Sequence, residues 1–574
     1  MSLPGDINKY QRPFTKFREH QFFVHVLAQD RLYDAQSFEQ IPKTNGIDVV
    51  AKRLSFGSGT QTCEGSIALK IRVCDLDRDI SWTVSATCPR LLKGIKVEIT
   101  NIPFKSMTDP FGQNIDIDDG SGYASTFPAG AYPNRVLPTS DISERGSWLP
   151  MSPAQFMLIN APDHTILIRS EDYPPQFKRY WFFRNGRSIN LVTYTEANGS
   201  EKKKIFSSPR YFLEKFDSIS DAVKIHAGWM RNAYKLVPFN ERKDVPKWVK
   251  NICLNLNFHC HATDGAVLNT FSTIEKKLEQ TAKFFDPKLT HIHIVGWDGQ
   301  WDYTWPGLIP DLILGGEKGL KQLVKKAHTF GYHIDLHMNV MGLSYQNPDF
   351  EKIKHFLEHQ IRDIQDRRVD WEYDWDGDEV DEKIFAYISP DHKPWRDYLI
   401  DRILAVVKKY QIDNVLLDQA TTIINDNRHN HVRGLNALFK KLREVLPPEI
   451  VISGEGTSEP VLGLYPLATH MVNADQSIVP QLLFDPFVRI FEYGHPTKPG
   501  RSIWSNPWRK TKETIEKETA TGGSRSFYEN LKKIEERKII PSILFKNDTI
   551  RADSVEAKAV YKVAARIRDQ LEID

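Results

Sequence analysis

The sequence predicts a mixed α/β protein in which a (β/α)8 TIM barrel follows an N-terminal β-sandwich domain. Two observations carry this prediction. Residues 1 to about 230 contain short strand-like segments without helical periodicity between them, which is typical of a sandwich. From about residue 249 onward, short apolar segments alternate with amphipathic helical segments, which is typical of βα repeats. We place the sandwich and a linker helix in residues 1–235 and the barrel in residues 236–574.

The N-terminal strands are predicted from short apolar segments that end at Gly, Pro, Asp or Asn. They cover residues 67–73, 82–86, 95–99, 155–159 and 165–169. A helical segment at 218–234 then leads into the second half of the chain.

The barrel strands are predicted as short segments buried on both faces, because most are rich in Leu, Ile and Val. They cover residues 252–258, 291–295, 334–338, 414–417, 450–452, 470–472, 487–493 and 539–544. Helices are expected at 273–285, around 320–327, and at 396–409, 435–446 and 555–571. An insertion at about 345–395 interrupts the repeats and contains a predicted helix at 350–364 and an acidic stretch at 370–382.

Two acidic residues stand directly after two of these strands. Asp418 follows the fourth predicted strand and Glu455 follows the fifth, with one helical segment between them. Parallel barrel strands end at the same rim, where the active sites of such barrels are built. A pair of carboxyl groups can cleave a glycosidic bond, because one attacks or stabilises C1 while the other protonates the leaving oxygen. Asp418 and Glu455 are therefore the candidate catalytic residues, and the alternative is that each only caps the loop after its strand.

Polar and aromatic side chains also follow the other predicted strands, where they could bind the hydroxyls and ring faces of a sugar. These candidates are Trp297, Asp298, Trp301 and Asp302 after strand two, His337 and Asn339 at the end of strand three, Gln419 beside Asp418, Asp475 after strand six and His495 after strand seven. The alternative for each is a packed side chain or a satisfied loop hydrogen bond. Gly454 and Gly456 flank Glu455, where missing side chains would let a substrate approach.

A metal-dependent hydrolase similar to the amidohydrolases is one alternative function. His259 and His261 follow the first predicted strand, and such a pair begins the metal site of some barrel hydrolases. Those sites need more histidines from later strands, whereas the fifth strand offers Glu455, and the nearby His429 and His431 lie in a polar loop. We therefore expect no metal in the catalytic site and no cofactor.

Two further alternatives concern calcium and binding without catalysis. The acidic segment 374–378 could hold Ca²⁺, but it lacks the full ligand pattern of an EF-hand loop. A non-catalytic carbohydrate-binding barrel would bind a sugar and never cleave it. In such a protein the two acids would lie too far apart to cooperate.

The composition excludes several classes of partner. The 76 basic and 74 acidic residues give a formal charge of +2, which predicts neither a nucleic-acid footprint nor a membrane-surface patch. No apolar segment is long enough to cross a bilayer, and the start of the chain shows no secretory signal. The five cysteines are an odd number without paired spacing, so free thiols in a reducing compartment are expected. A cytoplasmic location follows as the expectation, although a chain trimmed of its leader would look the same.

Four segments resemble a known group of proteins. Residues 416–419 (LLDQ), 452–456 (ISGEG), 296–299 (GWDG) and 315–316 (GG) resemble uncharacterised bacterial glycosidase-like barrels. Those are similar, more distantly, to endo-α-N-acetylgalactosaminidases and to the barrels of α-amylases and dextranases. In these relatives an Asp after strand four is the nucleophile and a Glu after strand five is the acid/base, so the resemblance implies these roles for Asp418 and Glu455. The relatives also carry a sandwich before the barrel, and many add a β-domain after it, for which the sequence beyond residue 544 has no counterpart.

Together these observations predict a retaining glycoside hydrolase that acts on α-linked sugars, in carbohydrate metabolism. Its partner would be an oligosaccharide or glycoside substrate. If the mechanism is retaining, the two carboxyl groups should lie about 5–5.5 Å apart, whereas about 6.5–9.5 Å would indicate inversion. The sugar, the linkage, endo or exo action and the oligomeric state are left open by the sequence.

Overall fold

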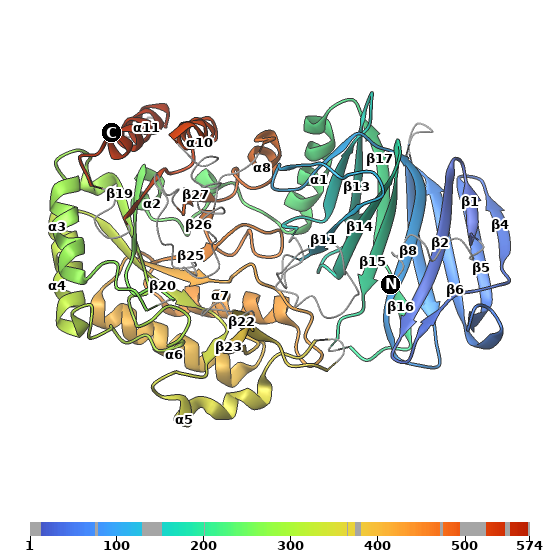
Figure 1. Ribbon diagram of the computed structural model, residues 1–574, viewed down its shortest axis with the longest axis horizontal. Helices are drawn as coiled ribbons and strands as arrows, with labels where there is room; N and C mark the ends of the chain where they lie inside the picture. Colours follow the sequence, from blue (N-terminus) through green and yellow to red (C-terminus); the bar gives the residue numbers. More distant parts are fainter. Residues whose placement is uncertain are drawn as a thin grey trace.

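A computed structural model describes residues 13–74, 79–128, 152–199, 201–263, 265–363, 366–373, 380–470, 475–493, 524–545 and 551–571. Two large antiparallel sheets form the N-terminal part of the chain, and a parallel sheet surrounded by helices forms the C-terminal part (Figure 1). The predicted mixed α/β architecture is confirmed.

The first N-terminal sheet has seven strands, each antiparallel to its neighbours. Its order is β1 (Thr15–Phe17), β2 (His20–Ala28), β8 (Leu92–Pro103), β15 (Ser188–Glu196), β14 (Phe177–Asn185) and β11 (Gly122–Phe127), with β3 (Leu32–Tyr33) beside β2.

The second sheet has ten strands and is also antiparallel. Its order is β10 (Asn114–Ile115), β9 (Ser106–Thr108), β12 (Phe156–Asn160), β13 (Thr165–Glu171), β17 (Arg210–Phe216), β7 (Ile80–Thr87), β6 (Gln61–Val73), β5 (Gly46–Phe56) and β4 (Glu39–Lys43), with β16 (Ile205–Ser207) beside β7.

The two N-terminal sheets share one hydrophobic core, as in a β-sandwich. Strand β7 shows how the sequence produces this packing, because Trp82, Val84 and Ala86 alternate with less buried residues and all belong to the core. Successive side chains of a strand point to opposite faces, so every second residue of β7 enters the space between the sheets.

Eight parallel strands form the C-terminal sheet. Their order is β28 (Ser542–Phe545), β18 (Leu254–His259), β19 (Thr290–Val295), β20 (His333–Asn339), β24 (Asn414–Asp418), β25 (Val451–Glu455), β26 (Leu467–His470) and β27 (Arg489–Glu492). A parallel bridge between Phe491 and Ile540 joins the two ends of this sheet, so it forms a nearly closed barrel. Each predicted barrel strand overlaps one of these strands, in the predicted order.

Helices alternate with these strands and cover the outside of the barrel (Figure 1). They are α3 (Phe271–Thr281), α4 (Gly316–Phe330), α6 (Lys393–Tyr410), α7 (His431–Val445), α8 (Ile478–Leu483), α10 (Ser524–Glu536) and α11 (Val555–Gln570). Shorter helical turns are η3 (Phe239–Glu241), α2 (Lys247–Asn251) and η4 (Pro287–Leu289). Helix α3 starts at a capping box of Thr270 and Thr273, and α4 ends at Gly331, whose φ of 96° suits glycine.

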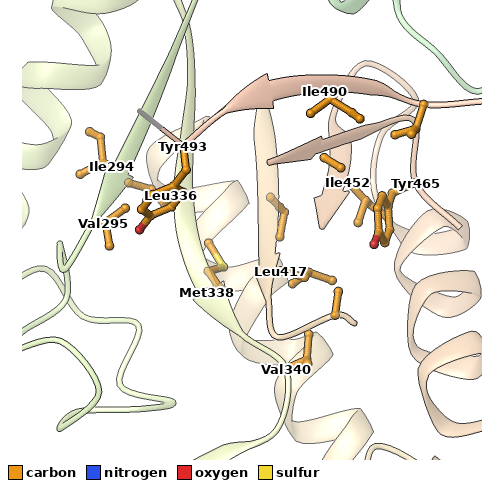
Figure 2. Close-up of a cluster of buried hydrophobic side chains, with 14 of the residues drawn as sticks. Ile294, Val295, Leu336, Met338, Val340, Leu417, Ile452, Tyr465, Ile490 and Tyr493 are labelled. Atoms are coloured by element: carbon orange, nitrogen blue, oxygen red, sulfur yellow. The ribbon is translucent and has the colours of Figure 1, made fainter. Parts of the chain in front are cut away.

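The barrel strands carry apolar side chains on one face and polar ones on the other. Ile294, Leu336 and Leu417 belong to the core shared with the helices, and Figure 2 shows them within one cluster of buried side chains. The residues that alternate with them are polar: Asn255 and Asn257 in β18, His291 and His293 in β19, Asp335 and His337 in β20, and Asn414 in β24. This second face is the barrel interior, and all of these polar residues are buried.

The structure differs from the predicted elements in two places. Strand β26 begins three residues before the predicted sixth strand, of which residues 471–472 lie outside the described residues. In place of one helix at 350–364, the insertion forms α5 (Phe350–Ile353) and the 3-10 helix η5 (Lys354–His359). The insertion also contributes a three-stranded sheet of β21 (Gly342–Ser344), β23 (Glu382–Tyr387) and β22 (Asp370–Tyr373). The candidate calcium segment 374–378 lies outside the described residues.

Helix α1 (Ile219–Ala233) lies between the sandwich and the barrel (Figure 1). Its residues Ala222, Val223 and Met230 belong to the same core as the barrel strands. Glu459 of the barrel is completely buried. It accepts one hydrogen bond from the Gln155 backbone N–H at 2.9 Å and one from Gln155 Nε2 at 3.1 Å. The carboxylate of Glu459 also contacts the ring of His226 in α1. Glu459 thus ties the loop after β25 to the N-terminal half.

None of the helices in the described part of the chain is both long and apolar enough to span a bilayer. The five cysteines are free thiols.

We predict that Glu459→Ala lowers the free energy of unfolding by about 3 kcal/mol, because it leaves buried donors of Gln155 without their acceptor. The measurement is chemical denaturation followed by tryptophan fluorescence. The control is Glu444→Ala, which removes a surface ion pair with Lys441 and should change stability by less than about 1 kcal/mol. Equal losses in the two variants would contradict the role assigned to Glu459.

Candidate active site

Asp418 and Glu455 end neighbouring parallel strands, β24 and β25. The strand register pairs Leu417 with Gly454, which brings the next two residues side by side. Their carboxyl groups are in hydrogen-bond contact with each other. Asp418 is 2% exposed, whereas Glu455 is partly exposed. The structure therefore brings the two predicted acids together at the carboxyl end of the barrel.

Burial and mutual repulsion move the pKa values of the pair apart. Burial raises the pKa of Asp418 to about 6, against hydrogen bonds from Glu455, Asn339 and the Gln419 backbone that lower it. Burial, followed by the charge of Asp418 and the hydrogen bond to it, raises the pKa of Glu455 to about 8. When two adjacent carboxyl groups titrate separately, the pair holds one proton at any pH that lies between their two pKa values. At neutral pH this proton lies on Glu455, and Asp418 is the carboxylate.

Asn339 holds the Asp418 carboxylate in a fixed orientation. Its Nδ2 donates to Asp418 Oδ2 at 2.9 Å. Its Oδ1 accepts from the backbone N–H groups of Met341 and Gly342, at 2.7 and 2.6 Å, which fixes the side-chain amide. Asn339 was predicted to bind sugar hydroxyls, and in the structure its amide is committed to Asp418.

Gln419 and the glycines around Glu455 shape the backbone of the site. The Gln419 N–H donates to Glu455 Oε2 at 3.0 Å, and Gln419 has a left-handed φ of 55°. A non-glycine residue in this region stores strain, which is common at functional sites. A Cβ on Gly454 would meet the Tyr465 ring at 2.4 Å. The space beside Gly454, which we expected to admit substrate, is therefore filled by an aromatic side chain. Gly456 has a φ of 74°, a conformation that favours glycine.

His337 connects the acid pair to a polar column inside the barrel. Its Nε2 lies 3.2 Å from Asp418 Oδ1, and its Nδ1 lies 3.2 Å from Nε2 of His293. His293 Nδ1 lies 2.6 Å from Asp335 Oδ1, and His291 Nε2 lies 3.0 Å from Asp335 Oδ2. These residues are fully or almost fully buried.

The residues of this column determine one another's protonation states. Burial alone would raise the pKa of Asp335, but His293 and His291 outweigh it and hold that pKa well below its usual range. Asp335 is therefore ionised, and the His293 Nδ1–H donates to it. Burial, followed by the neighbouring His293, lowers the pKa of His337 to about 3. The ring beside Asp418 is thus neutral at physiological pH.

Asp302 is a third carboxyl group near the pair. It is 1% exposed, and burial, followed by the charges of Asp418 and Glu455, raises its pKa well above the usual range. Its φ of 70° places a second left-handed residue in the site. The side chain of Trp371 donates a hydrogen bond to Asp302. Asp302 is thus a neutral acid that can donate a proton in a hydrogen bond to a ligand oxygen.

The insertion contributes to the site through its small sheet. Tyr387 of β23 is completely buried, and burial followed by the charges of Asp418 and Asp302 raises its pKa well above the usual range. Its hydroxyl lies close to the Gln419 side chain. Trp371 of β22 contacts Asp302, as described above. Tyr387 and Trp371 therefore form one wall around the three carboxyl groups.

The three other candidates after strand two have structural contacts. Trp297 is fully buried and donates from Nε1 to the backbone oxygen of His337 at 2.9 Å. Asp298 accepts from the Leu308 N–H at 3.0 Å and supports the loop, and burial raises its pKa to about 7. Trp301 packs edge-on against the His337 ring, with centroids 4.4 Å apart. Trp301 is 1% exposed, so it buttresses the ring that touches Asp418.

Asp475 is the next candidate, and none of its described contacts joins it to the acid pair. Asp475 is half exposed, and it accepts from the Asn114 N–H at 3.3 Å and lies 3.7 Å from Lys533 Nζ. His495 lies outside the described residues.

The histidines of the alternative metal site are engaged in other contacts. His261 Nδ1 lies 2.7 Å from the Asp311 carboxylate. The ring of His259 lies beside that of Tyr493, with centroids 5.6 Å apart. Within the described part of the chain, neither belongs to a group of three side chains that could hold a metal ion.

Several residues of the site were missed by sequence reasoning. They are Asp335, His293, Tyr387, Trp371 and Tyr493, and the last is buried near Glu455 and Asp418. One signal could have found the first two. Polar residues recur at every second position in three successive strands, as Asn255 and Asn257, His291 and His293, and Asp335 and His337 do. Such a period marks one polar face.

A cavity of about 600 Å³ lies at the opposite end of the barrel. It is lined by residues next to the starts of strands, among them Asn251, Arg489 and Ile539. Barrel chemistry is found at the other rim. We therefore locate the candidate site at the carboxyl groups and not in this cavity.

Comparisons with known proteins agree with this architecture. One family model, described as a domain of unknown function (DUF6259), matches residues 215–478. No match to the sequence was found among curated proteins. The chain is similar in structure to an α-N-acetylgalactosaminidase of Bifidobacterium bifidum in complex with GalNAc, with a TM-score of 0.66, 12% identity and coverage of 96% of this chain and 88% of that one.

Two more distant structures show the same arrangement. A GH31 family sulfoquinovosidase of E. rectale, bound to an aza-sugar inhibitor, has a TM-score of 0.53, 11% identity and coverage of 96% and 80%. A GH36 α-galactosidase of Geobacillus stearothermophilus in complex with stachyose has a TM-score of 0.50, 9% identity and coverage of 96% and 76%. The fold is thus one found in glycoside hydrolases.

We predict that Asp418→Asn lowers the pKa of Glu455 from about 8 toward its ordinary value, because it removes the adjacent negative charge. Burial still acts on Glu455 in the variant, so the fall should be incomplete. The measurement is infrared or ¹³C NMR titration of the glutamic acids in wild type and variant. An unchanged Glu455 pKa would show that the two carboxyl groups are not coupled.

Proposed function

We propose that the protein is a retaining glycoside hydrolase that acts on α-linked sugars. Asp418 attacks C1 of the sugar, and Glu455 first protonates the leaving oxygen and then accepts a proton from water. The observation that carries this proposal is the contact between two carboxyl groups whose pKa values, about 6 and about 8, lie on opposite sides of neutrality. Such a pair supplies a nucleophile and an acid at the same pH.

The close contact of the pair supports retention over inversion. An inverting enzyme separates its carboxyl groups by about 6.5–9.5 Å to leave room for a water, and a retaining one holds them about 5–5.5 Å apart. Asp418 and Glu455 are within hydrogen-bond contact, so their separation is shorter than either of these distances and nearer to that of a retaining pair. A sugar that enters between them would separate them toward the shorter of these distances.

The choice of α-linked substrates rests on the structural neighbours. Their names give an α-N-acetylgalactosaminidase and an α-galactosidase, both on the same barrel architecture. The surrounding residues have supporting roles in this proposal. Asn339 orients the nucleophile, and protonated Asp302 donates a hydrogen bond to a sugar oxygen.

Substitution of the two acids should affect turnover differently. Asp418→Asn should reduce the hydrolysis of aryl α-glycosides by at least about 10⁴-fold, because the nucleophile is lost. Glu455→Gln should reduce turnover about 10²–10⁴-fold for natural leaving groups, and much less for leaving groups that need no protonation. The measurement is kcat/KM on a panel of aryl α-glycosides of graded leaving-group acidity.

Matched controls for these variants are Asp163→Asn and Glu351→Gln, whose side chains are 83% and 79% exposed. Both should keep wild-type rates. Full activity of Asp418→Asn would overturn the assignment of the nucleophile, and an equal loss of Glu455→Gln on all leaving groups would overturn that of the acid.

The pH dependence of kcat/KM should be bell-shaped, with its maximum between about 6 and about 8. Activity should rise with pH as Asp418 loses its proton, and fall at higher pH as Glu455 loses its own. In Glu455→Gln the alkaline limb should disappear for substrates with good leaving groups. A wild-type rate that keeps rising well above pH 8 would be inconsistent with an acid at Glu455.

A further inference from the structure

Three histidines from separate segments converge outside the carboxyl site. His359 ends η5 of the insertion, His392 is the N-cap of α6, and His429 lies in the loop before α7. Each offers a ring nitrogen, and these nitrogens all lie within 4.8 Å of one another. The rings of His359 and His392 stack with centroids 3.6 Å apart, and that of His429 lies 6.0 Å from each. All three residues are partly exposed, so a small ion can reach them.

Hydrogen bonds next to each histidine fix the three segments relative to one another. Asp391 accepts from the Asn430 N–H at 2.9 Å and from Arg433, which joins the segments of His392 and His429. Arg428 donates to the backbone oxygens of Glu358 and Gln360, on either side of His359. The backbone around the cluster is thus held without any help from the three rings.

A buried carboxylate orients one of the rings. Asp426 is 1% exposed, and its Oδ2 lies 2.7 Å from Nδ1 of His429. Its Oδ1 accepts from the backbone N–H groups of Arg362 and Arg428, both at 3.1 Å, so the carboxylate cannot turn away. With Nδ1–H of His429 donated to Asp426, Nε2 carries the lone pair. A carboxylate on the far nitrogen is the usual companion of a histidine that binds a metal.

The rings of His359 and His392 make no hydrogen bond to another residue in the part of the chain that the structure describes. His392 caps helix α6, but its side chain makes no capping hydrogen bond.

We propose that His359, His392 and His429 bind one divalent transition-metal ion of the zinc class. Three imidazole nitrogens suit Zn²⁺, whose fourth position is then taken by water. A tetrahedral ion with Zn–N bonds of about 2.0–2.1 Å places its ligand nitrogens about 3.4 Å apart. The stacked rings of His359 and His392 must turn out of their parallel arrangement to direct both nitrogens at the ion. The hard cations Ca²⁺ and Mg²⁺ prefer oxygen ligands and are not expected. The positive charge of Arg428 opposes the ion, and the Asp426 carboxylate offsets it.

The position of the cluster gives the ion a structural role. His359 and His392 flank the β22–β23 part of the insertion, which supplies Trp371 and Tyr387 to the carboxyl site. His429 lies in the loop that starts after Asp418. A bound ion would therefore clamp the insertion to that loop. This inference does not depend on the glycosidase activity, because its readout is metal binding.

The test is a titration of chelator-stripped, untagged protein with Zn²⁺, followed by calorimetry, and with Co²⁺, followed by visible absorption. Wild type should bind one equivalent of either ion, give the strong visible bands of four-coordinate Co²⁺, and melt at a higher temperature with the metal. His359→Ala and His429→Ala should each lose at least about 100-fold in affinity, and Asp426→Asn about 10–100-fold. The matched control is His355→Ala, an exposed histidine of the same insertion, which should bind as wild type does.

Two results would overturn the proposal. One is a stripped wild-type protein that takes up no zinc or cobalt. The other is uptake that is unchanged in both folded variants, His359→Ala and His429→Ala, as checked by circular dichroism, because the ion would then bind elsewhere. Glycosidase assays are not needed for either result, so failure of this proposal is distinguishable from failure of the proposed function.

Discussion

The buried contact between Asp418 and Glu455 is the interaction on which the site depends. A carboxyl pair cannot be buried with two negative charges, so one proton must remain between them. Hydrogen bonds to Asp418 determine which acid keeps it. Asn339 donates to the Asp418 carboxylate, and the Gln419 backbone also lowers the pKa of Asp418. These groups favour ionised Asp418, and the proton therefore stays on Glu455.

Parts of the chain far from β24 and β25 keep this arrangement in place. The insertion closes one side with Trp371 and Tyr387. The sandwich side acts through Gln155, whose hydrogen bonds to Glu459 anchor the loop that begins at Glu455. Both contacts act on loops that leave the ends of barrel strands, so the barrel sets the position of the acids and its additions set their surroundings. The three-histidine cluster would add a third restraint of the same kind.

Sequence reasoning predicted the parts of this structure that depend on local pattern. Asp418 and Glu455 could be found because each directly follows an apolar strand, and parallel strands end at one rim. The roles of Trp297 and Asn339 could not be found, because a side chain at a strand end reveals its residue type but not its partners. Tyr387 and His429 come from an insertion and a loop without periodicity, so only the folded chain shows what they approach.

In the proposed mechanism, Asp418 forms a covalent bond to the sugar and Glu455 acts as the general acid and base. The most direct test is reaction with a fluorinated α-glycosyl fluoride that slows breakdown of the intermediate, followed by mass spectrometry of the intact protein and its peptides. We expect one glycosyl group per chain, attached to the peptide that contains Asp418, and release of product with its α-configuration retained. Attachment to Glu455 or Asp302, or a first-formed product of inverted configuration, would contradict it.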